Sequence, residues 1–423
     1  MIAEQIVDKR GEKAPISWQF HVIIFFIAFA LVVSRRPDAL FNPQFWAEDG
    51  KNWYAQAYNL GILPSLFLPH TGYLQTISRL TASLAQFFPL AFAPLIFNLV
   101  AIAIQILPVN LVISSRFAAL IPTLKSRLLL GLVYLALPNS YEINANITNA
   151  QWHLALLACM VVLAAPSRLL IWRCFDVGVV LISALSGPFA ILLTPIAAIR
   201  WWVRRHKWLF SILVILAIGA LVQCLSLLQQ TRTVAELGAS PKLFFKILAG
   251  QVFLSSLFGQ KGYEWIMPKH SLYLPLTVLI CGISLLALLY ALFNAPLELR
   301  LFIIFAASIF GTALASPVVS LNSPQWESMW IPGTGGRYWF LPMLAFVTTL
   351  IWLLSVKKPY NFRRVAIVAL AIMLVGITLD WTYPRFADFK FGEYANKFAA
   401  APQGSKVIIP INPPGWKMEL VKR

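Results

Sequence analysis

Two adjacent carboxylates, Glu48 and Asp49, are the residues of this chain whose types and spacing best suit chemistry. They lie in the segment FWAEDGKNWYAQAYNLG, shortly after the first strongly apolar run. The chain has only 16 Asp and Glu against 34 Lys and Arg, so two neighbouring acids in a Trp- and Tyr-rich loop need a reason. A carboxylate beside a membrane-facing cavity could take a proton from an attacking hydroxyl group. The alternatives are a solvated pair, or a cap on a helix through 51–58.

A basic counterpart is found far along the chain, in the segment GTGGRYWF. The glycines would let the backbone approach a phosphate, the guanidinium of Arg337 can bind it bidentately, and Tyr338 could add a hydroxyl donor. Otherwise Arg337 reaches lipid headgroups from a flexible loop. His70 and Arg79 are further candidates for binding a phosphate group, and His70 could instead orient a second substrate. A structural histidine and a lipid-anchoring arginine are the alternatives for these two.

Candidates for binding sugar hydroxyls gather in EINANITNAQWH, residues 142–153, which is unusually polar for a turn between two apolar runs. Aromatic rings of the acidic loop could stack on sugars or anchor the loop at the membrane interface. An ordinary polar turn that caps the next helix is the alternative reading of 142–153. The residues expected to bind the sugar or the acceptor are Trp46, Tyr54, Asn146, Asn149, Gln151 and His153.

A metal site is the less favoured interpretation of the acidic pair. Two adjacent carboxylates could hold a divalent cation through oxygen ligands, but no third acid lies nearby in the sequence. Glu142, Glu264 and Glu327 are the distant acids expected on the same face. No two of the four cysteines are spaced as CxxC, which argues against a disulfide framework and a thiolate metal site. We therefore expect neither a metal nor another cofactor.

The composition predicts an all-α polytopic membrane protein. Of the 423 residues, 59% are hydrophobic and 12% are charged, whereas a soluble globule carries about 25% charged residues. Apolar runs of roughly 15–25 residues fit membrane helices. The net charge of +18 could suggest nucleic acid. However, many basic residues cluster in short loops between apolar runs, a pattern that sets membrane orientation, so no nucleic-acid partner is expected.

The apolar runs predict a bundle of about eleven membrane-spanning helices. Lys9, Arg10 and Lys13 place the N-terminus in the cytoplasm, and most dense basic clusters then fall on that face. Arg35 and Arg36, directly after the first run, depart from this rule. The expected spans are 16–34, 89–113, 127–141, 151–166, 170–186, a short run after Pro188, 207–228, 271–293, 300–317, 337–356 and 363–379.

The loops divide the chain into a transmembrane module, 1–379, and an outer-face tail, 380–423. The first outer loop, 35–88, carries the acidic pair and an amphipathic stretch over 72–88. That stretch either lies in the interface plane or begins a spanning helix. A second long outer loop is expected over 229–270. In the tail, the rigid turn of INPPGW could form a small cap over the site.

The position of the acidic pair and the layout of the whole chain resemble the GT-C superfamily of polytopic glycosyltransferases, which use polyprenyl-phosphate sugars as donors. Bacterial O-antigen-modifying glucosyltransferases and aminoarabinose transferases are among its members. The matching residues are Glu48 and Asp49, followed by Trp53 and Tyr54. This motif is short, and many members have Asp first.

The resemblance implies that an acceptor hydroxyl attacks the anomeric carbon of the donor sugar with inversion, while a carboxylate takes its proton. The lipid phosphate leaves, and a fixed cation stabilises its charge. Glu48 is the favoured base, with Asp49 close behind. The expected partners are a polyprenyl-phosphate-linked sugar, a glycan or lipid-linked acceptor and membrane lipids. The expected location is a bacterial cytoplasmic membrane, with the site facing outward.

A polytopic lipid or polysaccharide transporter is the alternative function. A flippase should place charged residues in mid-membrane and often has repeated halves. The predicted spans contain almost no acidic residues, and no internal repeat is apparent. These features favour the enzyme.

Overall fold

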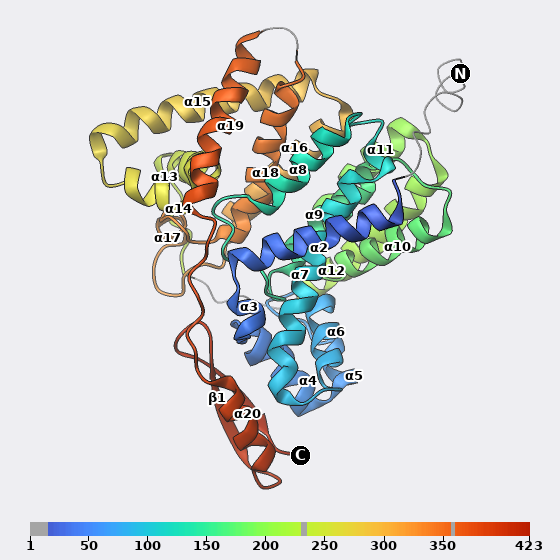
Figure 1. Cartoon of the computed structure of the whole chain (residues 1–423), viewed down its shortest axis with the longest axis vertical. Helices are drawn as coiled ribbons and strands as arrows, with labels where there is room; N and C mark the ends of the chain where they lie inside the picture. Colours follow the sequence, from blue (N-terminus) through green and yellow to red (C-terminus); the bar gives the residue numbers. More distant parts are fainter. Residues whose placement is uncertain (1–15, 230–234, 357–359) are drawn as a thin grey trace.

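The computed structural model describes residues 16–229, 235–356 and 360–423 (Figure 1). Lys9, Arg10 and Lys13 lie outside the described residues. The described chain is mostly helical, with one antiparallel hairpin near the C-terminus. Its elements are α2 (Trp18–Arg35), α3 (Asp38–Phe41), η1 (Asp49–Tyr54), α4 (Ala55–Leu60), α5 (Ile62–Leu66), α6 (Thr76–Ala85), η2 (Leu90–Phe92), α7 (Ala93–Ile113), η3 (Ser115–Phe117), α8 (Leu124–Leu135), α9 (Ala150–Leu163), α10 (Leu170–Ala184), α11 (Phe189–Arg204), α12 (Lys207–Leu228), α13 (Pro241–Ile247), η4 (Leu248–Leu254), α14 (Ser255–Ile266), α15 (His270–Asn294), α16 (Leu297–Ala315), α17 (Gln325–Met329), α18 (Gly336–Leu353), α19 (Tyr360–Leu379), α20 (Phe391–Ala400), β1 (Lys406–Ile411) and β2 (Trp416–Val421).

Within the described ranges, eight helical segments are long and apolar enough to cross a membrane. This confirms the coarse prediction of a helical polytopic membrane protein. Seven of the eight coincide with expected spans, and the eighth is Pro241–Ile266. The other four expected spans are the helices α8, α9, α10 and α11, which have 12 to 16 residues. They reach about 18–24 Å, less than a hydrocarbon core of about 30 Å, so the total of eleven remains a prediction.

Most of the described part of 229–270, where a long outer loop is expected, is helical, and Pro241–Ile266 is long and apolar enough to cross a membrane. Helices α13 and α14 are joined by the wide turn η4 into one broken rod, Pro241–Ile266. The fully buried side chain of Gln251 donates hydrogen bonds to the carbonyl oxygens of Met329 (2.7 Å) and Ile331 (2.6 Å). Gln251 therefore bonds within the protein rather than to water.

The rod breaks at Gly259, where φ is +73° and a Cβ would lie 2.6 Å from the carboxylate of Asp380. That carboxylate accepts hydrogen bonds from the backbone N–H groups of Gln260 (2.6 Å) and Lys261 (3.2 Å). Glycine is needed here because only it adopts this backbone conformation and lets the acid approach. A buried carboxylate thus satisfies the amides that the break exposes.

Arg35 and Arg36, which depart from the charge rule, are buried where α2 ends. Arg35 donates to the carbonyl oxygens of Leu135 (2.7 Å) and Leu137 (3.1 Å) at the end of α8. The guanidinium of Arg36 lies 3.9 Å from the ring centre of Phe386. Both charges are held inside the protein by carbonyl groups and aromatic rings. This explains how they can occur beside a span against the loop-charge pattern.

The amphipathic stretch predicted over 72–88 forms helix α6. It buries the polar side chains of Ser78 and Arg79, whereas Leu80 and Leu84 are 42% and 45% exposed. A helix at the surface of a soluble protein has the reverse pattern. This burial is the one expected for a helix whose apolar face lies in the membrane interface.

The C-terminal tail packs against the loop that carries the acidic pair. In Figure 1, α20 and β1 extend from the bundle on the same side as α3 to α6. The N–H of Asn412 donates to the carbonyl of Phe45 at 3.1 Å, and the rings of Trp46 and Phe386 stack with centres 4.9 Å apart. These contacts fix the tail over the start of the Glu48 segment.

Candidate functional site

A cavity of about 550 Å³, here called the Glu48 cavity, lies between the acidic loop, the polar turn before α9 and the start of α18. The ends of α11, α12 and α16 supply apolar side chains to its walls. Its size is that of a small-molecule or cofactor site. Of the twelve predicted site residues, those that line it are Trp46, Glu48, His70, Asn149, Gln151, Arg337 and Tyr338.

The two adjacent acids have different environments, although both lie at the start of the π-helical turn η1. Asp49 is 1% exposed, and its carboxylate accepts hydrogen bonds from the N–H of Ile147 (3.2 Å), the N–H of Thr148 (2.8 Å) and the hydroxyl of Thr148 (2.7 Å). Glu48 lines the cavity, and in the described part of the chain no other residue hydrogen-bonds its carboxylate. Asp49 therefore holds the polar turn, whereas Glu48 is available to a ligand.

Burial raises the pKa of the Glu48 carboxyl above its usual value. The nearby guanidinium of Arg337 offsets part of this rise, whereas the negative charge of Glu142 adds to it. A carboxylate with a raised pKa accepts a proton more readily near neutral pH. The environment of Glu48 thus suits a general base.

Arg337 is held by a partner that sequence reasoning treated only as a distant acid, Glu142. The two form an ion pair, and the N–H of Arg337 donates to the second oxygen of Glu142 at 3.0 Å. The guanidinium also donates to the carbonyl of Val318 at 2.7 Å. Gly335 has φ +64°, so the glycine run forms the turn into α18. Glu142 could have been noticed because it begins the polar segment 142–153.

Tyr338 and His70 supply uncharged polar groups to the cavity wall. The hydroxyl of Tyr338 accepts a hydrogen bond from the N–H of Val318 at 3.0 Å. Burial, and after it the charge of Arg79, lowers the pKa of His70 to about 4. His70 is therefore neutral at physiological pH and can hydrogen-bond a ligand but cannot neutralise a phosphate. Among the described lining residues, Arg337 is the only Lys or Arg.

Gln151 and Asn149 face the cavity from the start of α9. The amide of Asn149 donates to the carbonyl of Glu142 at 2.8 Å. The side-chain oxygen of Gln151 is buried, and no described residue donates to it. A Cβ at Gly187, where φ is +87°, would collide with this oxygen. An unpaired buried oxygen is costly, and a ligand hydroxyl would satisfy it.

Arg79 and His153 do not line the cavity, so their positions do not support the predicted ligand contacts. Arg79 lies behind Trp53, 4.7 Å from its ring centre, and donates to the carbonyl of Leu68 at 3.1 Å. His153 is buried between the hydroxyl of Tyr134 (2.8 Å) and the carbonyl of Ile143 (3.1 Å). Both side chains position the walls of the site instead.

Tyr54 and Asn146 are also structural in their contacts. Tyr54 is 2% exposed, and its ring packs against that of Phe45 at 5.5 Å. The amide of Asn146 donates to the carbonyl of Glu142 at 2.7 Å, and its oxygen accepts from the N–H of Asn149 at 3.0 Å. Asn146 therefore shapes the polar turn rather than facing a ligand.

The tail contributes Pro413 and Trp416 to the cavity lining, as the possible cap predicted from INPPGW requires. The ammonium group of Lys51 lies 4.9 Å from the ring centre of Trp416. This cation–π contact joins the cap to the acidic loop.

A metal ion would need several side chains that could bind it together. In residues 16–229, 235–356 and 360–423, no group of three or more His, Cys, Asp or Glu side chains is placed to hold a metal ion. The absence of a cofactor from the reaction remains a prediction. Neither protein-family models nor curated proteins match this chain.

Proposed function

We propose that this chain is a GT-C-like membrane glycosyltransferase that transfers a sugar from a polyprenyl-phosphate donor to a glycan or lipid-linked acceptor. The observation that carries the proposal is that Glu48 lines a cavity in which Arg337 is the one Lys or Arg among the described lining residues. A base and a cation on the walls of one cavity are what a sugar transfer from a phosphate requires.

In the proposed reaction, an oxygen of Glu48 takes the proton of the acceptor hydroxyl. The acceptor oxygen forms a bond to the anomeric carbon, and the bond from that carbon to the phosphate oxygen breaks. Its electron pair leaves with the phosphate, where Arg337 stabilises the growing negative charge. A single displacement of this kind inverts the anomeric carbon. Glu142 is a positioning residue, because it holds the guanidinium in place.

The apolar wall of the cavity supports a lipid-linked donor. Ile191 and Leu192 of α11, Leu227 of α12 and Ile309 and Ala313 of α16 line this wall. A polyprenyl chain would lie along these helix ends, with its phosphate near Arg337 and its sugar toward Gln151. The basic clusters lie toward the opposite ends of these helices, which favours a site on the outer face of the membrane.

The direct test is mass spectrometry of the surface glycans of cells with and without the gene. The proposal expects loss of one sugar substituent from an otherwise complete glycan. If intact lipid-linked saccharide accumulated on one side of the membrane with no missing substituent, the transporter alternative would be favoured instead.

Replacement of Arg337 tests the cation. Arg337→Gln is expected to slow transfer by about 10²- to 10³-fold, because the leaving phosphate loses its charge partner. The measurement is transfer rate against donor concentration in detergent-purified protein. Arg337→Gln also leaves the carboxylate of Glu142 without its ion-pair partner, which could destabilise the fold. The double variant Arg337→Gln, Glu142→Gln removes that unpaired charge. A transfer rate that stays low in the double variant therefore reflects the lost cation and not misfolding. Arg205→Gln, on an exposed residue outside the cavity, is the matched charge control. An unchanged rate would exclude Arg337 from the site.

Glu142→Gln provides a pH test. Because the charge of Glu142 raises the pKa of Glu48, its removal lowers that pKa. The base is active when deprotonated, so the acid side of the pH–rate profile is expected to move to lower pH. The measurement is transfer rate over acidic to neutral pH in wild type and variant. A shift to higher pH would contradict the assigned environment of Glu48.

A further inference from the structure

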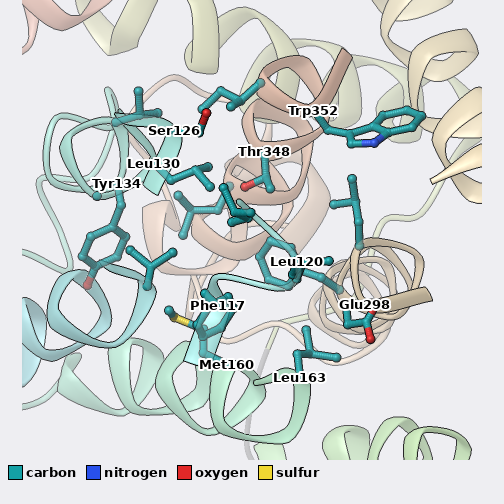
Figure 2. Close-up of a pocket in the computed structure, with 18 of the residues that line it drawn as sticks. Phe117, Leu120, Ser126, Leu130, Tyr134, Met160, Leu163, Glu298, Thr348 and Trp352 are labelled. Carbon is teal, nitrogen blue, oxygen red and sulfur yellow. The ribbon is translucent and has the colours of Figure 1, made fainter. Parts of the chain in front are cut away.

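Two more cavities adjoin one another at a different end of the bundle. The first, shown in Figure 2, has a volume of about 340 Å³ and is lined mainly by apolar residues of α7, α8, α9, α16 and α18. The second, of about 500 Å³, is lined by the basic residues Arg116, Arg200 and Arg204 among others. They adjoin, because both are lined by Leu120, Leu163, Pro296 and Glu298.

This region is separate from the Glu48 cavity. In helix α9, Trp152 of the first turn lines the Glu48 cavity, whereas Met160 and Leu163 near the other end line the apolar cavity. Helix α18 likewise contributes Tyr338 at its start to one site and Trp352 at its end to the other. The two sites therefore lie at opposite ends of the same helices.

The basic cavity holds more positive than negative charge. Arg116 is neutralised by Asp176, to which it makes two hydrogen bonds of 2.6 and 2.9 Å. Glu298, however, faces two guanidinium groups, those of Arg200 at 2.9 Å and Arg204 at 3.0 Å. One carboxylate cannot neutralise two arginines, so one positive charge remains for an anion.

Arg200 shares its only carboxylate partner with Arg204 and also has an unsatisfied hydrogen-bond donor. Its side chain is 6% exposed, and no described residue accepts a hydrogen bond from its Nε. A buried donor without a partner is costly, and an oxygen of a phosphate is the acceptor that a guanidinium binds best. Arg204, with a side chain 54% exposed, lies on the solvent side of this pair.

We propose that the two joined cavities bind an anionic glycerophospholipid. Its phosphate would contact Arg200 and Arg204, and one acyl chain would occupy the apolar cavity between α8, α9 and α18. A free phosphate would use only the basic part, whereas the apolar cavity beside it fits a ligand that is both anionic and hydrocarbon-bearing. This proposal does not depend on the reaction at the Glu48 cavity.

Native mass spectrometry of the full-length protein in mild detergent tests the proposal. Phosphatidylglycerol, phosphatidylethanolamine and water-soluble glycerol phosphate are titrated separately. Wild type is expected to retain phosphatidylglycerol in preference to phosphatidylethanolamine and not to retain glycerol phosphate. Arg204→Gln should reduce that preference roughly fivefold, the effect of one basic residue near an anionic headgroup. Thr348→Trp, which fills the apolar cavity without altering charge, should abolish retention.

Arg205→Gln is the matched control, because it removes the neighbouring positive charge outside both cavities. Equal losses in Arg204→Gln and Arg205→Gln would overturn the site in favour of general surface charge. Retention in Thr348→Trp would overturn the acyl-chain assignment. Tighter binding of polyprenyl phosphate than of phosphatidylglycerol at this site would overturn the choice of a glycerophospholipid.

Discussion

Glu48→Gln is expected to slow sugar transfer by orders of magnitude while the protein remains folded. Glutamine has nearly the same shape but cannot take the proton of the acceptor, and loss of a general base costs about 10²- to 10⁴-fold in rate. Folding should be little changed, because no described residue other than Glu48 itself hydrogen-bonds the Glu48 carboxylate. Transfer rate and thermal unfolding of the purified variant are the two measurements.

The control for Glu48→Gln is Glu393→Gln, which changes an exposed acid on α20 in the same way. It should retain full activity. If Glu48→Gln were as active as this control, Glu48 would not be the base. Loss of activity together with loss of folded protein would also contradict the assignment, since it would show that Glu48 is structural.

Asp49 is expected to show the opposite behaviour. Asp49→Ala leaves the N–H groups of Ile147 and Thr148 and the Thr148 hydroxyl without their acceptor. At about 1 kcal/mol for each lost hydrogen bond, the free energy of unfolding should fall by about 3 kcal/mol. Asp49→Asn keeps an oxygen acceptor and should retain most of the stability and the activity. Inactive but stable Asp49→Asn would make Asp49 the base.

The stability that Asp49 contributes should depend on pH. Burial raises its pKa to about 7, whereas an aspartate in an unfolded chain has a pKa of about 3.9. Because the folded pKa is the higher one, the contribution is fully present below about pH 4 and is lost as pH rises through about 7. Between pH 5 and pH 8, the unfolding temperature of wild type should therefore fall more than that of Asp49→Asn. Parallel curves would contradict this.

Long apolar elements could be predicted from the sequence, because length and composition are sufficient to define them. The expected span 207–228 coincides with α12, and 271–293 lies within α15. The rod Pro241–Ile266 could not be predicted in this way. Its glycines and buried Gln251 resemble a loop until the carbonyl groups that Gln251 contacts are known.

The site was predictable where a side chain had an unusual local context, as for Glu48 and Arg337. Their convergence on one cavity depends on how distant helices pack, and so does the pairing of Arg337 with Glu142. The sequence could not show which residues of the polar turn face the cavity and which hold the turn together, because the same residue types do both. Gln151 faces the cavity, whereas Asn146 bonds to the backbone around it.

The shortness of α9 has a consequence for how a lipid substrate would be handled. A helix of 14 residues is about 21 Å long, which is less than a hydrocarbon core of about 30 Å. If α9 spans the membrane, as predicted, at least one of its ends therefore lies inside the hydrocarbon. If that end is the one near Trp152, which lines the Glu48 cavity, the cavity reaches below the headgroup plane. For the proposed reaction, the donor need not be extracted from the bilayer. Each methylene kept in hydrocarbon avoids an extraction cost of about 0.8 kcal/mol.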